Sequence, residues 1–422
     1  MSKLEELIKE LCPNGVEYKT LGEACDTVTD YVAAGSFAEI AKNVTYIKTP
    51  DFAQLVRTKD LKAKFTNNDT VYISEHAFNY LWRVNLDRES IILPNIGNCG
   101  EVYYVTPKCL PYKHNVLATN AILLRSTTCN NKYLYHLFTN NEFQKNLKKI
   151  TSPSGQTKFN KTDLKKISIP VPPMEVQREI VRILDNFTEL TAELTAELTA
   201  RKKQYEYYRE KLLNEANTKA SESRRFGDIA TIVRGASPRP ISSFITDKEN
   251  GINWIKIGDV QPDSKYITQT KEKITLEGAK KSRMVNVGDF ILSNSMSFGR
   301  PYIMKIQGCI HDGWLAISNF EKYFQSDFLY YLLNSNTIQH EMEQKASNGT
   351  VKNLNADIVR NLELPLPPLA EQERIVSILD RFDKLCNDIS EGLPAEIEAR
   401  KKQYEYYRDK LLTFKNIDSE AN

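Results

Sequence analysis

The chain has 422 residues, too many for one ordinary hydrophobic core, and this length predicts roughly two to four folded units. Its hydrophobic content of 41% and charged content of 26% are typical of a soluble globular protein, and no stretch approaches the ~18 apolar residues of a membrane span. The N-terminus lacks the apolar core of a signal peptide, so we expect a cytoplasmic protein without membrane contact. The net charge of +3 neither requires nor excludes nucleic acid.

Catalytic and metal-binding motifs are scarce. Seven cysteines are scattered without a CxxC pair, which predicts reduced thiols and argues against a zinc site. The GxxxxGKS/T, HExxH, GxSxG and GxGxxG motifs are also missing. The string Pro262–Lys265, with Glu272, is similar to the acidic and lysine residues of metal-dependent nucleases, but such short strings are common. We therefore expect no metal site and no catalytic residues.

The first part of the chain, up to about residue 166, is a mixed globular region. Ser90–Leu93 and Val102–Val105 predict strands, and Lys132–Phe138 predicts a short amphipathic helix. The polar loop Ser152–Lys161 follows. Its small residues let backbone N–H groups approach phosphates, and its Lys, Asn and Gln side chains suit contacts with phosphates or base edges. A solvated connector remains the alternative for this loop.

A long helix comes next. The proline-rich segment Ile169–Pro173 is expected to be extended and to lead the chain into the helix. Apolar residues then recur every three or four positions, which predicts a helix over Met174–Leu213, about 40 residues and roughly 60 Å long. A periodic pattern longer than ~25 residues usually indicates a coiled coil. The expected partner is a second copy of this pattern later in the chain.

This helix contains a tandem in which Thr-Ala-Glu-Leu occurs at Thr191–Leu194 and again at Thr195–Leu198. Four residues add about 6 Å and close to one turn, so a block can be gained or lost while nearly the same face stays inward. From Asp185 to Arg201 the first helix has 16 residues, and the corresponding stretch of the second helix has 20. We predict that the number of tandem blocks sets the length of the helix. Its spacer residues are Thr191, Leu194, Thr195 and Leu198.

The second half follows the same plan. Asp289–Leu292 predicts a strand, Asp327–Leu333 a short helix, and Ser347–Asn355 a second polar loop. The proline segment Leu364–Pro368 again leads into a helix. Gly392–Pro394 should break or kink this second helix before it restarts.

Near-identical segments establish an internal duplication. Arg201–Leu213 returns as Arg400–Leu412, with Glu210 replaced by Asp409, and Gln177–Asp185 returns 195 residues later. A repeat of half the chain predicts two domains of like design rather than a solenoid. We expect an α+β fold in which two mixed α/β domains are separated by two long helices. The helices would pack as an antiparallel intramolecular coiled coil, with pseudo-two-fold symmetry from the duplication.

Polar and basic residues of the two globular regions are candidates for DNA contact, although for any one of them a merely solvated side chain is the competing interpretation. The candidates are Lys62, Lys64, Arg83, Lys113, Gln156, Lys158, Asn160, Lys161, Arg234, Lys256, Asn294, Arg300, Lys352 and Asn353.

The repeated Arg-Lys-Lys-Gln-Tyr-Glu-Tyr-Tyr segments have two interpretations. Their tyrosines either pack across the coiled coil, or also present two like surfaces on which two copies of one partner dock. The docking candidates are Tyr205, Tyr208, Tyr404 and Tyr407.

Together, these motifs resemble the specificity subunits of type I restriction-modification systems. The resemblance rests on Pro170–Asp185, Arg201–Leu213, their copies Pro365–Asp380 and Arg400–Leu412, and the tandem, and it extends over essentially the whole chain. It implies that each domain reads one half of a bipartite DNA site while the helices set the unread spacer. It also implies two docked modification subunits that methylate adenine with S-adenosylmethionine, and restriction subunits that use ATP and Mg²⁺, so this chain itself binds no cofactor.

The resemblance gives the domain boundaries. We predict a first target-recognition domain over 1–168, a lead-in and spacer helix over 169–216, a second target-recognition domain over 217–363, a second lead-in and helix over 364–415, and a tail over 416–422. Two other functions remain open: a stand-alone DNA-binding regulator with duplicated readers, and a coiled-coil adaptor without a DNA function.

Overall fold

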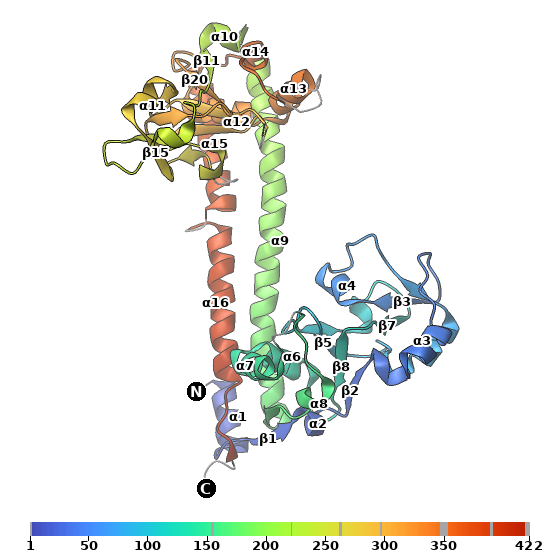
Figure 1. Ribbon diagram of the computed structural model, residues 1–422. Coiled ribbons are helices and arrows are strands. Elements are labelled where there is room, and N and C mark those ends of the chain that lie inside the picture. Colours follow the sequence, from blue (N-terminus) through green and yellow to red (C-terminus); the bar gives the residue numbers. More distant parts are fainter. Residues whose placement is uncertain are drawn as a thin grey trace. The chain divides into compact units, whose positions relative to one another are not determined.

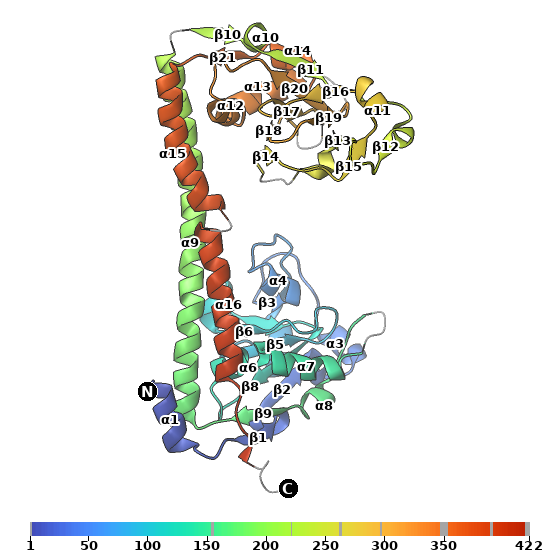
Figure 2. The same cartoon turned by 90° about the vertical axis from the view of Figure 1, so that its left-hand side faces the viewer.

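The computed structural model describes residues 2–152, 156–220, 222–260, 264–295, 298–346, 353–388 and 391–417. The chain divides into two compact units, residues 1–194 with 396–422, and residues 195–395. Figures 1 and 2 show these units from two sides. Within the described ranges, no helix is both long and apolar enough to cross a bilayer.

The first unit contains a small mixed domain, the first part of the helix α9 and, from residue 396 on, a C-terminal segment of the chain. Its elements in chain order are α1 (Lys3–Leu11), β1 (Glu17–Thr20), α2 (Leu21–Ala24), β2 (Thr27–Asp30), the 3₁₀ helix η1 (Tyr31–Ala34), α3 (Phe37–Asn43), β3 (Ala53–Val56), α4 (Thr58–Lys62), β4 (Tyr72–Ile73), α5 (Glu75–Tyr80), η2 (Trp82–Val84), β5 (Ser90–Pro94), β6 (Tyr103–Val105), η3 (Pro107–Cys109), β7 (Asn115–Leu117), β8 (Ala121–Arg125), α6 (Asn131–Thr139), α7 (Asn141–Ile150), α8 (Lys161–Leu164), β9 (Ser168–Val171) and α9 (Met174–Lys219).

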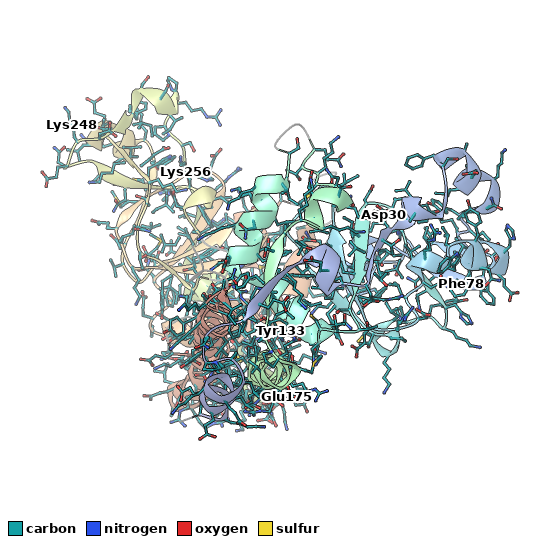
Figure 3. All side chains as sticks on the ribbon, turned by 90° about the horizontal axis from the view of Figure 1, so that it is seen from below. Asp30, Phe78, Tyr133, Glu175, Lys248 and Lys256 are labelled. Atoms are coloured by element: carbon teal, nitrogen blue, oxygen red, sulfur yellow. The ribbon has the colours of Figure 1, made fainter. Side chains whose placement is uncertain are left out.

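The first domain contains a four-stranded sheet in the order β2-β8-β5-β6, a three-stranded sheet in the order β4-β3-β7 and the antiparallel pair of β1 and β9. Successive side chains of a strand point to opposite faces of the sheet. Ile91 and Leu93 of β5 therefore join the core that contains α6 and the start of α9, whereas Ile92 joins the core shared with the smaller sheet. Tyr133 of α6 donates from its hydroxyl to the carbonyl of Pro170 (3.1 Å), near the start of α9 where Glu175 lies (Figure 3).

The second unit repeats this plan with more strands. Its elements are β10 (Ser223–Arg225), α10 (Phe226–Ile229), β11 (Thr231–Arg234), η4 (Ile241–Ser243), β12 (Ile245–Thr246), β13 (Ile252–Ile255), η5 (Ile257–Asp259), β14 (Tyr266–Ile267), β15 (Glu272–Ile274), α11 (Leu276–Lys280), β16 (Arg283–Val285), β17 (Phe290–Ser293), β18 (Pro301–Met304), β19 (Gly308–Ile310), β20 (Trp314–Ser318), α12 (Ser326–Leu333), α13 (Asn336–Ala346), α14 (Ala356–Arg360), β21 (Glu363–Pro365) and α15 (Leu369–Asn387). The helix α16 (Leu393–Leu411) then returns the chain to the first unit.

The sheets of the second domain correspond to those of the first. The order β11-β20-β17-β18 repeats β2-β8-β5-β6 and adds β14 at one edge. The parallel pair β13 and β19 corresponds to the parallel pair β3 and β7. The duplication predicted from the helical segments is therefore present in the globular domains as well, and the predicted strands at 90–93, 102–105 and 289–292 are confirmed to within one residue.

Within each unit, α9 packs against a helix from the C-terminal half of the chain. In the second unit, Lys219 near the end of α9 pairs with Glu371 near the start of α15 (3.0 Å), and the ring of Tyr208 stacks on Phe382 at 6.0 Å. The two helices therefore run in opposite directions. In the first unit, Phe187 of α9 stacks on Tyr407 of α16 at 5.4 Å.

The second long helix is interrupted as the sequence predicts, since α15 ends at Asn387 and α16 begins at Leu393. The boundary predicted for the first helix was too short. α9 has 46 residues and continues to Lys219, because Leu213 and Ala216 are buried in the core of the second domain and extend its apolar face beyond the repeated segment.

Buried glutamines join each domain to its helix in the same way. Gln177 accepts a hydrogen bond from the backbone of Asn130 (2.8 Å) and donates to the carbonyl of Pro172 (2.8 Å). Gln372 accepts from Gln325 (2.9 Å) and donates to Pro367 (2.9 Å). A buried amide needs such partners, so the glutamine of the repeated motif is a structural anchor.

Candidate nucleic-acid interface

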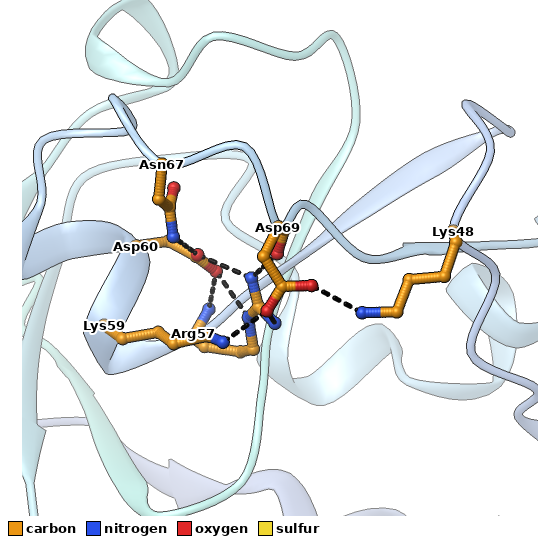
Figure 4. A network of polar contacts seen from close by, with 6 residues as sticks. All are labelled: Lys48, Arg57, Lys59, Asp60, Asn67 and Asp69. Carbon is orange, nitrogen blue, oxygen red and sulfur yellow. Dashed lines mark hydrogen bonds and ion pairs between the residues drawn. The ribbon is translucent and has the colours of Figure 1, made fainter. Parts of the chain in front are cut away.

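An ion-pair network occupies one end of the smaller sheet in the first domain (Figure 4). Asp60 is buried and accepts hydrogen bonds from the guanidinium of Arg57 (2.7 and 2.8 Å) and from the amide of Asn67 (2.7 Å). Lys48 and Lys59 pair with Asp69 at 2.6 and 2.5 Å, and these hydrogen bonds hold the pKa of Asp69 well below its usual value. Arg57 and Lys59 therefore neutralise carboxylates of their own domain.

The candidate residues near this network differ in whether their side chains have partners within the domain. Lys62 ends α4 and pairs with Glu101 (2.6 Å). Lys64 is exposed, adopts φ +48° and has no ion pair among the described residues. Lys113 is exposed before β7. Arg83 donates to the carbonyl of Ala33 (2.6 Å) and lies over the ring of Trp82.

Part of the loop predicted at 152–161 lies outside the described residues, namely 153–155. Gln156 and Lys158 are exposed, and the carbonyl of Lys158 accepts from the backbone N–H of Ser152 (2.9 Å). Asn160 accepts from the backbone of Asp163 (2.7 Å) and so caps α8, and Lys161 pairs with Asp30 (3.1 Å). The last two residues therefore have structural partners, as the connector interpretation predicts.

Two candidates of the second domain converge on Asp312. The carbonyl of this residue accepts from Arg234 Nε (3.0 Å) and from the amide of Asn294 (2.9 Å). Lys256, labelled in Figure 3, pairs with Glu272 (2.5 Å) at the end of β13. Arg300 lies over the ring of Tyr302 at 5.9 Å.

The structure corrects the prediction for Asn294. Its side chain is only 4% exposed and is used inside the domain, so it has no face to present to DNA. Asn353 is exposed, and Lys352 lies outside the described residues. Asn355, which the sequence placed in the same polar loop, caps α14 by accepting from the backbone of Ile358 (2.9 Å).

The spacer residues lie in the middle of α9. Thr191, Leu194 and Leu198 are partly buried, and Thr195 is exposed. Thr191 also donates from its hydroxyl to the carbonyl of Phe187 (2.8 Å).

The repeated tyrosines separate into inward and outward sets. Tyr205 and Tyr404 are partly buried, and burial raises the pKa of Tyr404 to about 12. Tyr208 and Tyr407 stack on phenylalanines of the helix pairs, which confirms packing for these residues. Tyr207 and Tyr406 were not among the predicted docking residues, yet they are 62% and 61% exposed. The same exposure in both copies is the signal for a repeated surface.

The candidates also omitted three lysines of α7, namely Lys145, Lys148 and Lys149. All three are exposed, and among the described residues none pairs with a carboxylate. The missed signal was the comparison with the second half, where the same positions of α13 carry His340, Glu343 and Gln344.

Over the parts of the chain that the structure describes, no group of three or more His, Cys, Asp or Glu residues could hold a metal ion.

Comparison with known proteins assigns the chain to a family. The model of the type I restriction modification DNA specificity domain matches residues 27–201 and again residues 218–399. The chain therefore belongs to the family of type I restriction-modification specificity subunits. Its function is DNA sequence specificity within such a system, through two domains. Specificity subunits are non-catalytic components of their complexes, and a stand-alone regulator is not favoured.

Individual relatives agree with this assignment. The specificity subunit of the type I restriction enzyme EcoR124I/EcoR124II of Escherichia coli is 36% identical over 268 residues, which are 61% of this chain and 65% of that protein. The HsdS subunit of Thermoanaerobacter tengcongensis has a TM-score of 0.54 at 18% identity, covering 96% of this chain and 99% of that one. A chain from a structure of type I R-M complex assembly and conformational transition gives 0.66 at 19% identity, covering 96% and 98%. The two solved structures support the fold alone.

Proposed function

We propose that each domain reads one half of a bipartite DNA site, that α9 and its partner helices set the unread spacer, and that two modification subunits dock on the repeated segments. S-adenosylmethionine, ATP and Mg²⁺ would then act on the partner subunits, and none would bind this chain. DNA and restriction-modification subunits are partners of the family, whereas the number of modification subunits and their docking site belong to this proposal.

The equal surfaces of the two repeated segments carry the proposal. Tyr207 and Tyr208 meet at 5.3 Å with an interplanar angle of 75°, and Tyr406 and Tyr407 meet at 5.3 Å and 77°. The two domains, by contrast, have diverged in sequence far more than the repeated segments. Equal surfaces suit two copies of one partner, and unlike surfaces suit two different DNA sequences.

The Thr-Ala-Glu-Leu tandem supports the proposal that the helices set the length of the unread DNA spacer. α9 is one continuous helix through both units, so each added block of four residues lengthens it by about 6 Å, or roughly two base pairs at 3.4 Å each.

Native mass spectrometry of the complex with the modification subunits of the same system tests the docking. We expect two modification subunits with the unsubstituted chain, one with Tyr207→Ala or Tyr406→Ala, and none with both. Phe37→Ala is the control, since Phe37 is 74% exposed but lies outside the repeat. Retention of both partners by the double variant would contradict the proposed docking surface.

A further inference from the structure

The helices α7 and α13 occupy the same position in the two domains. Gln144 of α7 donates to the carbonyls of Gly100 (3.0 Å) and Phe138 (2.7 Å). Gln339 of α13, 195 residues later, donates to the carbonyls of Gly299 (2.9 Å) and Leu333 (2.7 Å). The duplication has therefore kept the framework that fixes each helix against its domain.

The glycines in this framework are also matched. Gly100 has φ +106° and Gly299 has φ +70°, in the left-handed region that side chains other than glycine rarely adopt. A Cβ atom at either position would lie 3.0 or 2.9 Å from the Oε1 atom of the facing glutamine. Both helices therefore lie against the same kind of tight loop.

The two helices differ at three exposed positions of the outer face. Phe143 and Leu147 of α7 are buried, and Lys145, Lys148 and Lys149 point outward at a spacing that places them on one face of the helix. The equivalent residues of α13, namely His340, Glu343 and Gln344, are exposed in the same way. At these three positions the first domain thus carries three lysines, and the second carries a histidine, a glutamate and a glutamine.

The lysines border a hollow that includes part of the polar loop. This hollow of about 400 Å³ lies between α7 and the segments around Gly100 and Thr157, and Lys145 and Lys148 form one wall. Thr157 also lines this hollow, and its hydroxyl donates to the carbonyl of Gly97 (2.5 Å). The lysine face therefore adjoins residues that the sequence already marked for DNA contact.

We propose that Lys145, Lys148 and Lys149 form a contact with the phosphate backbone of DNA beside the half-site of the first domain, and that α13 carries no equivalent at the matching positions. This inference rests on the proposed function. Within the described ranges no carboxylate of the protein pairs with these exposed lysines, so they are available to an anionic ligand, and duplex DNA presents closely spaced phosphates. Such contacts carry no sequence information, so they position the first domain without changing what it reads.

Salt dependence measures phosphate contacts directly. The logarithm of the apparent binding constant falls linearly with the logarithm of the salt concentration, with a slope of about 0.9 per neutralised phosphate. If each lysine neutralises one phosphate, the variant Lys145→Gln/Lys148→Gln/Lys149→Gln should lower this slope by up to about 2.7. On doubling the salt concentration, the unsubstituted complex should then lose roughly sixfold more affinity than the variant. The sequence preference should stay the same.

The experiment uses the complex with its modification subunits and two duplexes, one with the methylated site and one with both half-sites scrambled. The matched control is Lys9→Gln/Lys42→Gln/Lys165→Gln, which removes three exposed lysines of the same unit from other elements. The gain variant His340→Lys/Gln344→Lys should raise the slope by up to about 1.8.

Three results would overturn the inference. The slope could be unchanged in the lysine variant, or it could fall equally in the control. The variant could also bind DNA normally while losing a modification subunit, which would assign the lysines to an acidic protein surface. Failure of the unsubstituted complex to distinguish the two duplexes would instead overturn the proposed function.

Discussion

Asp409, near the end of α16, accepts a hydrogen bond from the backbone N–H of Asn141 (3.2 Å), the first residue of α7. Glu210 of α9 does the same for Asn336, the first residue of α13, at 3.1 Å. These carboxylates are the single difference between the two 13-residue repeats, and both perform the same task. The end of each repeated segment therefore caps a helix of the domain in its own unit.

Removing one cap should destabilise one unit. A carboxylate at a helix N-terminus satisfies a free N–H and favours the helix dipole, so Asp409→Ala should cost about 1 kcal/mol. Hydrogen exchange should show faster exchange at the start of α7 and no change in α13. Glu405→Ala is the control, because Glu405 is exposed one turn earlier on the same helix. Equal exchange in both variants would refute the capping role.

The buried glutamine anchors should be sensitive to substitution. Gln177→Leu leaves the N–H of Asn130 and the carbonyl of Pro172 without their partner, which should cost about 1 to 3 kcal/mol in the free energy of unfolding. Denaturant unfolding measures this cost, with Gln156→Leu at an exposed position as the control. An effect of Gln177→Leu no larger than that of the control would contradict the anchor.

Deleting Thr195–Leu198 should shift the preferred spacer between the half-sites and leave the half-site letters unchanged, because one helical turn is removed without touching either domain. Methylome sequencing of cells carrying the deletion measures both properties. The control replaces Thr195 by Ser at constant length. A change in the half-site sequences with an unchanged spacer length would contradict the role of the tandem as a spacer.

Acid should weaken the second unit through Glu371. Hydrogen bonds from Arg374 and Lys219 lower the pKa of Glu371 to about 2. A lowered pKa means that the stabilisation is present above the usual carboxyl value, near 4.5, and is lost as pH falls toward 2. Because solvent screens these pairs, Glu371→Gln should cost only about 1 kcal/mol at pH 7.

Thermal unfolding between pH 7 and pH 3 checks this linkage. The difference in unfolding temperature between Glu371→Gln and the unsubstituted chain should become smaller toward pH 3. The difference for the control Glu373→Gln, on the same helix, should not change with pH in this way. A difference that is independent of pH would contradict the role of the carboxylate charge.

The internal duplication and the local sequence patterns made much of the fold predictable from the sequence. The spacing of Ile180 and Leu184 predicted the helix, and Gly392–Pro394 predicted its interruption, because periodicity and backbone restriction are local properties. The end of α9 at Lys219 was missed since Ala216 is buried by a domain that folds against it.

The interface was less predictable because the role of a polar side chain depends on its neighbours in space. Asn294 and Lys158 look alike as candidates in the sequence, yet one is buried against Asp312 and the other is exposed. Alignment of the two halves would have found Lys148 opposite Glu343, whereas a motif search passes over a lysine on an ordinary amphipathic helix.

Two independent DNA readers in one chain are best tested by methylome sequencing of a host that expresses this chain with the modification subunits of its system. We expect methylated adenines in a two-part motif with a fixed, unread gap. Replacement of residues 217–363 by the corresponding domain of a relative should change the base sequence of one half-site only. A single contiguous motif, or letters that change on both sides, would contradict two independent readers held apart by the helices.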